Sequence, residues 1–246
     1  MPGKLWQSWR RLWRLRHLKE AYRPLLSEDD GALVSIDCET SSLKVKEAEI
    51  LSIAAVRIEG NRLRTSDAFY TLIKPQRALD HENIRVHGLR PRDFDAGLPL
   101  EEALEKFLRF TGGRTLLGYY LQYDIAVLNK HLKPILGAAL PNHEVEVSGH
   151  YYDWRFADYP DGYIDLSWET IIKNLHIPAL PRHDAMNDAI TVGMMYLALQ
   201  ARGHSESPAL APVSSSSVSD KPPETGSALP PPPPPPPSRL GQGDFE

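Results

Sequence analysis

Three strand-like segments between residues 33 and 73 constrain the fold of this chain more than any other feature of the sequence. Leu33–Ile36 is short and apolar, and Ile50–Ile58 is a longer apolar run closed by the turn residues Glu59–Asn61. Ala68–Ile73 follows and stops at Pro75, which cannot donate a hydrogen bond to a sheet. Strands joined by such short turns predict an antiparallel meander.

Segments of helical period then alternate with shorter apolar segments. Four helices are expected at Leu100–Phe110, Ile125–Leu136, Leu166–Leu175 and Ala185–Leu199, and two short strands at Thr115–Leu117 and Val145–Val147. No element is predicted for the Tyr- and Trp-rich stretch that continues to Tyr163. This order predicts an α/β protein with a mixed β-sheet, a meander plus parallel strands, flanked by α-helices.

The chain divides by composition into a basic segment of residues 1–28, a body of residues 29–202 and a Ser/Pro-rich tail of residues 203–246. The tail contains Pro230–Pro237, an unbroken run of prolines, and cannot bury a core. We therefore expect it to be disordered or to form polyproline II. Such a tail either engages an aromatic-lined groove of a partner protein, such as a polymerase, or is an unbound linker.

Tryptophan and leucine recur at helical spacing in the N-terminal segment, at Leu5, Trp9, Leu12 and Trp13, among arginines. The spacing predicts an amphipathic helix with Trp on one face and Arg on the other. A helix of this kind fits nucleic acid, an anionic membrane surface or a partner protein. Its tryptophans would equally well pack on the body, so these alternatives stay open.

The charge is distributed unevenly along a chain whose formal net charge is −4 at pH 7. Residues 1–25 hold seven Lys or Arg and one acid, whereas residues 204–246 hold two basic and five acidic residues. These ends carry +6 and −3, which leaves −7 on the rest of the chain. An acidic body argues against a general electrostatic grip on nucleic acid and suits carboxylates gathered around cations.

The single cysteine, Cys38, excludes an intramolecular disulfide and a cysteine metal cluster, and it fits a reducing compartment. No run of about 18 apolar residues is present, so no membrane span is expected. The basic N-terminus also lacks the continuous apolar core of a signal peptide. We therefore expect a cytoplasmic protein.

Two acids stand at alternate positions where the first apolar strand ends, Asp37 and Glu39. Side chains two residues apart on a strand point to the same side, so these carboxylates would lie side by side. Two adjacent carboxylates repel each other, and a divalent cation would supply the missing countercharge. The same residues also fit a solvated strand end that leads into the Ser41–Ser42 turn.

Further candidate residues come later in the chain. Asp124 stands at the start of a predicted helix, where it also fits an N-cap or a first-turn acid. His183 follows a Pro-containing loop, and a lone histidine is usually structural or solvated. Asp184 fits the N-cap of the last helix, whereas Asp188 would face inward on that helix and need a partner.

These motifs, taken in order, resemble the DEDDh exonuclease family. The set comprises Asp37-x-Glu39-Thr40, then Tyr120-x-x-x-Asp124, then His183-Asp184-Ala185-x-x-Asp188-Ala189. The resemblance covers roughly residues 31–200 and includes the bacterial replicative proofreading subunit and ribonuclease T among its relatives. It implies a ribonuclease H-like fold and hydrolysis of nucleic acid from the 3′ end to nucleoside 5′-monophosphates, with DNA favoured and RNA an alternative.

The resemblance assigns a role to each matching position. Asp37, Glu39 and Asp188 correspond to direct ligands of two Mg²⁺ or Mn²⁺ ions, and Asp124 corresponds to the fourth acid, which acts directly or through water. His183 corresponds to the general base that activates the attacking water. A histidine titrates near neutral pH and suits that task.

The resemblance also implies contacts with the terminal nucleotide of a single-stranded 3′ end. Thr40 and Leu43 would lie near it, and so would His87, whose segment also fits an ordinary turn. The family usually has His-Asn where this chain has Tyr119-Tyr120. That departure alters the expected substrate wall and leaves the metal ligands intact.

A second hypothesis comes from a different class of protein. The fold would then be a recruitment module that binds nucleic acid or a polymerase with weak or no catalysis, its two unusual ends doing the biological work. A module has no reason to keep every ligand position, so the sequence favours the enzyme.

Overall fold

The computed structural model describes residues 2–27, 29–77, 88–160 and 162–203, which belong to one compact unit. His87 and the proline-rich tail lie outside these residues, so the expectations placed on them stay predictions. For residues 2–8 the structure describes the backbone alone.

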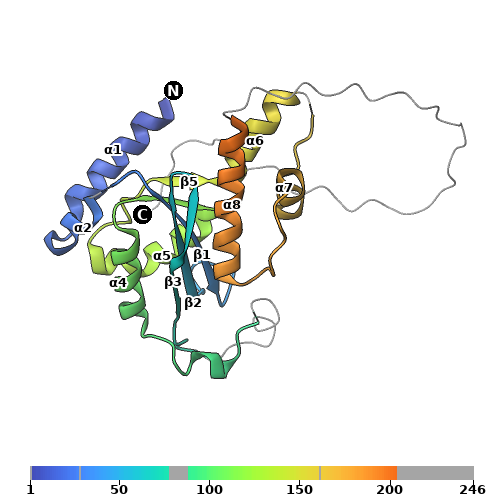
Figure 1. The fold of residues 1–246 in the computed structure, drawn as a ribbon. Helices are drawn as coiled ribbons and strands as arrows, with labels where there is room; N and C mark the ends of the chain where they lie inside the picture. Colours follow the sequence, from blue (N-terminus) through green and yellow to red (C-terminus); the bar gives the residue numbers. More distant parts are fainter. Residues whose placement is uncertain (1, 28, 78–87, 161, 204–246) are drawn as a thin grey trace, which may run out of the picture. The chain divides into compact units, whose positions relative to one another are not determined.

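A five-stranded mixed sheet forms the centre of the molecule, with strand order β3-β2-β1-β4-β5 (Figure 1). The antiparallel meander consists of β1 (Leu33–Thr40), β2 (Ile50–Glu59) and β3 (Arg62–Leu72). The short strands β4 (Thr115–Gly118) and β5 (Glu144–Glu146) then add in parallel beside β1. The predicted mixed sheet of meander plus parallel strands is confirmed.

Helices cover both faces of this sheet (Figure 1). One face packs against α4 (Leu100–Thr111) and α5 (Leu121–Leu136). The other face packs against α8 (Ala185–Gly203), which is joined by α6 (Val147–Asp158) and α7 (Trp168–Leu175). The sheet is therefore the middle of three layers.

Alternation along β1 assigns its side chains to these two layers. Val34, Ile36 and Cys38 are buried in the core shared with α4 and α5. Ser35 points the other way, and its Oγ donates to the carbonyl of Ala189 on α8 at 2.7 Å. The side of β1 that carries Asp37 and Glu39 is therefore the α8 side.

Several elements differ from their predicted bounds, and each difference has a local cause. β1 continues through the two acids because it keeps pairing with β2 as far as Ile50. β3 begins at Arg62, six residues before the predicted start, because its first half is exposed at the sheet edge and needs no apolar pattern. The predicted strand at Val145–Val147 ends at Glu146, where α6 follows directly.

The α6 helix and a short 3-10 helix at Pro91–Phe94 were not predicted from the sequence. The Gly149 and aromatic residues of α6 have weak helix propensity. Two contacts stabilise the helix in place of intrinsic propensity. Tyr151 is fully buried, and the Glu146 carboxylate caps the helix by accepting from the Ser148 backbone N–H at 3.3 Å.

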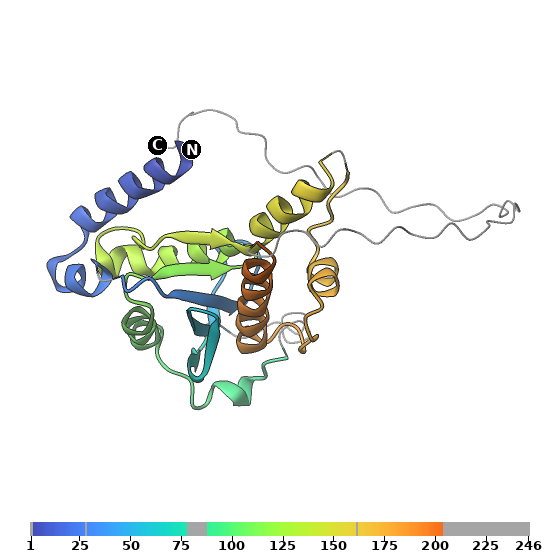
Figure 2. The ribbon, with the colours of Figure 1, turned by 45° about the horizontal axis from the view of Figure 1, so that its top comes forward.

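The N-terminal segment is a helix, α1 (Pro2–His17), followed by two short turns of helix at Glu20–Tyr22 and Arg23–Ser27. It is therefore not continuous to residue 28. The helix lies beside the β5 edge, where the Arg14 guanidinium donates to the carbonyl of Leu140 at 2.7 Å (Figures 1 and 2). Within the described residues, no helix has the length and apolarity needed to cross a membrane.

Candidate active site

A group of three carboxylates forms where β1 continues beyond its pairing with β4. Asp37 and Glu39 come from this strand, and Asp188 comes from the first turn of α8. One carboxylate oxygen of each residue lies within 4.8 Å of those of the other two. Residues about 150 positions apart in the sequence thus meet at one point, and we call Asp37, Glu39 and Asp188 the carboxylate group.

Small side chains allow α8 to approach the sheet closely enough for this meeting. Ala185 and Ala189 are buried against Ala54 of β2, and Ser35 contacts the α8 backbone directly. Asp184 caps the helix, because its Oδ1 accepts from the Asn187 backbone N–H at 3.0 Å. The predicted N-cap is thereby confirmed, and the start of α8 is fixed so that Asp188 points toward β1.

Asp124 lies beside the carboxylate group and is nearly fully buried, with 6% of its surface exposed. It occupies the first turn of α5, which begins at Leu121, four residues before the predicted start. Burial raises the pKa of its carboxyl, and the neighbouring backbone and thiol of Cys38 act in the opposite direction. The fourth acid is therefore held from the opposite layer of the sheet, next to Asp37.

Burial and mutual repulsion change the protonation of all four acids. Desolvation raises the pKa of Asp37 well above its usual value, with repulsion from Asp124, Glu39 and Asp188 adding to it. Desolvation likewise raises the pKa of Glu39 to about 7 and that of Asp124 to about 7, and it raises the pKa of Asp188. The site lacks sufficient positive charge to hold its carboxylates ionised by itself.

Arg182 supplies part of that positive charge. It lowers the pKa of Asp37, of Glu39 and of Asp188, each against the larger effect of burial. Its guanidinium stacks 4.4 Å above the ring of Trp168 and pairs with Glu169 at 3.1 Å. The motif pattern alone gives Arg182 no role. Its adjacency to His183 was the one available signal, since both of its partners lie on α7.

His183 lies on the loop just before α8 with its side chain exposed. Its backbone adopts a left-handed conformation with φ of 61°, which is uncommon for a residue other than glycine. Its backbone N–H donates to Asp188 Oδ2 at 3.2 Å. The strained loop thus fixes the histidine beside one member of the carboxylate group while leaving the imidazole accessible to solvent.

The Tyr119-Tyr120 pair occupies the wall next to the site. The Tyr119 hydroxyl donates to the carbonyl of Leu166 at 3.0 Å, and its ring meets Trp168 edge-on at 5.2 Å. Tyr120 has φ of 54° and exposes 66% of its surface. The Glu146 carboxylate holds this turn by accepting from the backbone N–H groups of residues 120 and 121 at 3.1 and 2.9 Å.

The residues predicted to contact the terminal nucleotide are placed as follows. Thr40 Oγ1 lies 2.7 Å from the hydroxyl of Tyr123, which also donates to the carbonyl of Ser42. The Tyr123 hydroxyl thus links the segment of Asp37 and Glu39 to the segment of Asp124. Leu43 exposes 89% of its surface. His87 lies outside the described residues.

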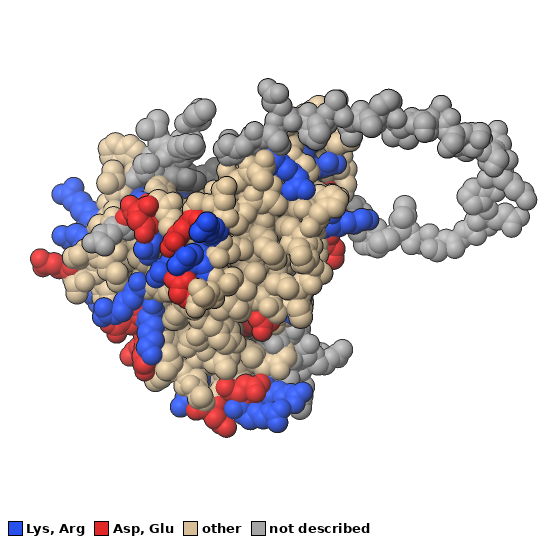
Figure 3. All heavy atoms as spheres, viewed as in Figure 1, with Lys and Arg blue, Asp and Glu red and all other residues tan. Residues whose placement is uncertain are grey.

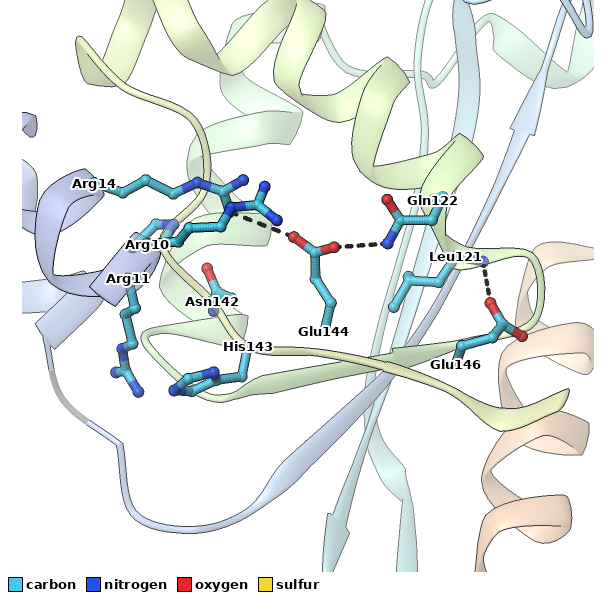
Figure 4. A pocket seen from close by; sticks show the side chains of 10 residues that line it. Arg10, Arg11, Arg14, Leu121, Gln122, Asn142, His143, Glu144 and Glu146 are labelled. Carbon is cyan, nitrogen blue, oxygen red and sulfur yellow. Dashed lines mark hydrogen bonds and ion pairs between the residues drawn. The ribbon is translucent and has the colours of Figure 1, made fainter. Parts of the chain in front are cut away.

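A cavity of about 320 Å³ lies elsewhere, between α1 and the β5 edge (Figure 4). Arg10 and Arg14 from α1 face Gln122 and Glu144 across it. None of its lining residues belongs to the carboxylate group, and neither Asp124 nor His183 lines it.

A mixed sheet with helices on both faces and a desolvated group of carboxylates at the end of its central strand defines the ribonuclease H-like class of α/β proteins. Comparison with known proteins narrows this class. The profile of the RNase T family, described as "Exonuclease", matches residues 34–196. The chain belongs to this family, the DEDDh exonucleases, which are phosphodiester hydrolases.

Curated relatives include polymerase III proteins. The DNA polymerase III subunit epsilon of Aquifex aeolicus is 30% identical over 113 residues, which cover 46% of this chain and 55% of the relative. DNA polymerase III PolC-type of Thermotoga maritima is 24% identical over 70% of this chain and 12% of its own length. The chain therefore spans about half or less of the length of these two relatives.

Solved structures share the fold at low sequence identity. Exonuclease I superimposes with a TM-score of 0.59 and 17% identity over 70% of this chain and 41% of its own. A form of the Escherichia coli enzyme in complex with a dT13 oligonucleotide also gives 0.59, with 17% identity over 70% and 42%. Cell-death related nuclease 4 gives 0.58, with 16% identity over 71% and 66%.

Proposed function

We infer that this protein hydrolyses single-stranded nucleic acid from its 3′ end and releases nucleoside 5′-monophosphates. The observation that carries the inference is the carboxylate group, in which three acids from two distant segments approach within 4.8 Å. Asp188 accepts one backbone hydrogen bond, from His183, yet burial raises the pKa of its carboxyl and so opposes ionisation. Acids kept together at this cost serve chemistry.

The donor set fits two Mg²⁺ or Mn²⁺ ions. Carboxylate oxygens are the ligands that these hard cations prefer, and the raised pKa values mark a local shortage of positive charge that cations would relieve. Asp37, Glu39 and Asp188 would bind them directly, and Asp124 would bind directly or through water. When bound, such ions stabilise the charge that develops on the phosphate and the departing 3′ oxygen.

The protein's own groups supply the remaining requirements. The exposed imidazole of His183, fixed beside Asp188 by its backbone N–H, would accept the proton of the attacking water. Thr40, linked to Tyr123, and the exposed Leu43 would border the terminal nucleotide. Tyr120 presents an aromatic ring where the family usually has Asn, which suits stacking on a base.

DNA is the favoured substrate. The relatives named above are DNA polymerase III proteins, and one structure of similar fold contains a dT13 oligonucleotide. RNA remains the alternative substrate class. A polymerase is the favoured protein partner for the same reason, with α1 or the proline-rich tail as the candidate contact.

The test uses matched DNA and RNA oligonucleotides that carry a label at either the 3′ or the 5′ end, incubated with Mg²⁺ or Mn²⁺. We expect immediate release of the 3′ label as a mononucleotide, and progressive shortening of the 5′-labelled strand. Asp188→Asn should abolish this activity, whereas the matched change Asp153→Asn, at an exposed acid of α6, should leave it unchanged.

Two outcomes would contradict the inference. Early release of the 5′ label would reverse the proposed polarity. Oligonucleotide binding without turnover in Mn²⁺ would favour the recruitment module. The observation that favours this alternative is Tyr119-Tyr120 in place of the family's usual His-Asn.

A further inference from the structure

The α1 helix turns Arg11, Arg14 and Leu15 toward the body, while two tryptophans and a leucine face solvent. The Arg11 guanidinium pairs with Asp29 at 3.1 Å, and that of Arg14 reaches Leu140 and Glu144. On the opposite side Trp9, Leu12 and Trp13 expose 72%, 63% and 62% of their surfaces. The alternative that the tryptophans pack on the body is therefore wrong for Trp9 and Trp13.

We propose that this outward face, made of Trp9, Leu12, Trp13 and Arg16, binds the surface of an anionic lipid bilayer. The four residues stand at positions i, i+3, i+4 and i+7 of one helix, so they lie along a single stripe. An apolar stripe that contains tryptophan, on a helix rich in arginine, is suited to lie in the plane of the membrane interface. The proposal is independent of the proposed catalytic function.

Charge complementarity supports an anionic surface. The helix contains five Lys or Arg residues and no acid, whereas residues 26–203 carry a net charge of −7. The helix is therefore favourably charged for contact with an anionic surface, in contrast to the net charge of the body. In Figure 3 basic side chains, with some acidic ones among them, project from the margin of the molecule that α1 and α2 (Arg23–Ser27) occupy in Figure 1.

The composition of the stripe favours lipid over the other occupants. A protein groove that covered Trp9 and Trp13 would also have to bury the exposed guanidinium of Arg16, which is costly without a partner. At a bilayer, Arg16 would extend to lipid phosphates while its methylene groups stay among the acyl chains.

Two further occupants fit less well. A nucleic acid strand would stack on the tryptophans but offer little to the aliphatic Leu12, which lies between them on the stripe. A second copy of the chain would bring two helices without acids face to face, and their like charges would repel.

The test is flotation of the full-length protein with lipid vesicles. One set is phosphatidylcholine alone, and the other contains roughly a third phosphatidylglycerol. We expect binding to the anionic vesicles, weakened when salt is raised from roughly 0.1 M to 0.5 M. The triple change Trp9→Ser, Leu12→Ser and Trp13→Ser should reduce binding by more than about tenfold, with oligonucleotide hydrolysis unchanged.

The matched control removes exposed aromatic surface elsewhere. Tyr152 and Phe156 of α6 stack at 5.7 Å and are 41% and 45% exposed, so Tyr152→Ser with Phe156→Ser should leave vesicle binding intact. Failure of the unaltered protein to float, or equal flotation of the triple variant, would overturn the proposal. Absence of vesicle binding together with a lower oligonucleotide affinity of the triple variant in EDTA would assign the stripe to nucleic acid. Absence of vesicle binding together with altered self-association would assign it to a second copy of the chain.

Discussion

The carboxylate group and the α1 stripe are built in opposite ways. The carboxylate group is acidic, largely desolvated, and assembled from segments about 150 residues apart. The α1 stripe is apolar and basic, exposed, and contained within eight consecutive residues, Trp9 to Arg16. A buried site can retain mutually repelling charges because the elements packed around it fix the positions of the side chains. An exposed stripe requires only the spacing of residues along one helix.

The largest expected effect comes from removing one charge from the carboxylate group. Asp37→Asn should lower the rate of oligonucleotide hydrolysis by more than roughly a thousandfold, because it removes one of the proposed metal ligands. In EDTA at pH 8 the same change should raise Tm by roughly 2–4 °C, since it removes a carboxyl whose pKa is raised by burial and by repulsion from its neighbours. Thermal unfolding and a rate assay on one preparation check both. A variant that loses Tm together with activity would show that Asp37 is structural.

Replacement of the histidine separates metal binding from proton transfer. His183→Ala should reduce turnover by about two to four orders of magnitude, the usual range for a general base. The increase in Tm that Mn²⁺ produces should persist, because the imidazole is not a proposed ligand. A loss of less than tenfold would argue against the base role, and loss of the Mn²⁺ effect would make His183 a ligand.

The raised pKa values predict how metal binding depends on pH. A folded-state pKa above the unfolded value contributes stability below about pH 4 that is lost as pH rises through the folded-state pKa, about 7 for Glu39 and Asp124. Cations bind the ionised carboxylates, so the Tm increase from Mn²⁺ should be at least roughly 3 °C larger at pH 8 than at pH 5.5. A Tm increase that does not depend on pH would mean that Mn²⁺ binds elsewhere. The same measurement on Asp188→Asn, which lacks one proposed ligand, is the control.

The smallest effect is expected where α1 attaches. Arg14→Ala removes the contacts with Leu140 and Glu144 and should cost about 1–2 kcal/mol of unfolding free energy, measured by urea denaturation. Hydrolysis should change by less than about twofold, because no group that Arg14 contacts belongs to the proposed site. Arg16→Ala, on the exposed face of the same helix, is the matched control and should leave stability unchanged. A large loss of rate in Arg14→Ala would show that hydrolysis at the carboxylate group depends on the attachment of α1.

Much of the candidate site was predictable because its residues carry local signals. Asp37 and Glu39 alternate at the end of an apolar strand, and Asp188 interrupts the apolar side of a long helix. The position of Arg182 was not predictable in this way, since it is set by Trp168 and Glu169 on another helix.

The same limit applied to the fold. The start of α5 was missed because its cap comes from the Glu146 carboxylate of β5, which accepts from the Leu121 backbone N–H. The α6 helix was missed because its own residues favour a helix only weakly, while burial of Tyr151 stabilises it. Local spacing contains neither of these long-range contacts.

The sequence by itself determined the mixed sheet, the alternation of side chains on β1, the family's motif order and the helical spacing of Trp9, Leu12 and Trp13. These follow from backbone periods and residue types, which act over a few neighbouring positions. The tertiary structure alone decided that Asp188 meets the β1 acids and that the tryptophan side of α1 faces solvent. Both outcomes depend on contacts between distant segments, and these contacts form only when the layers pack together.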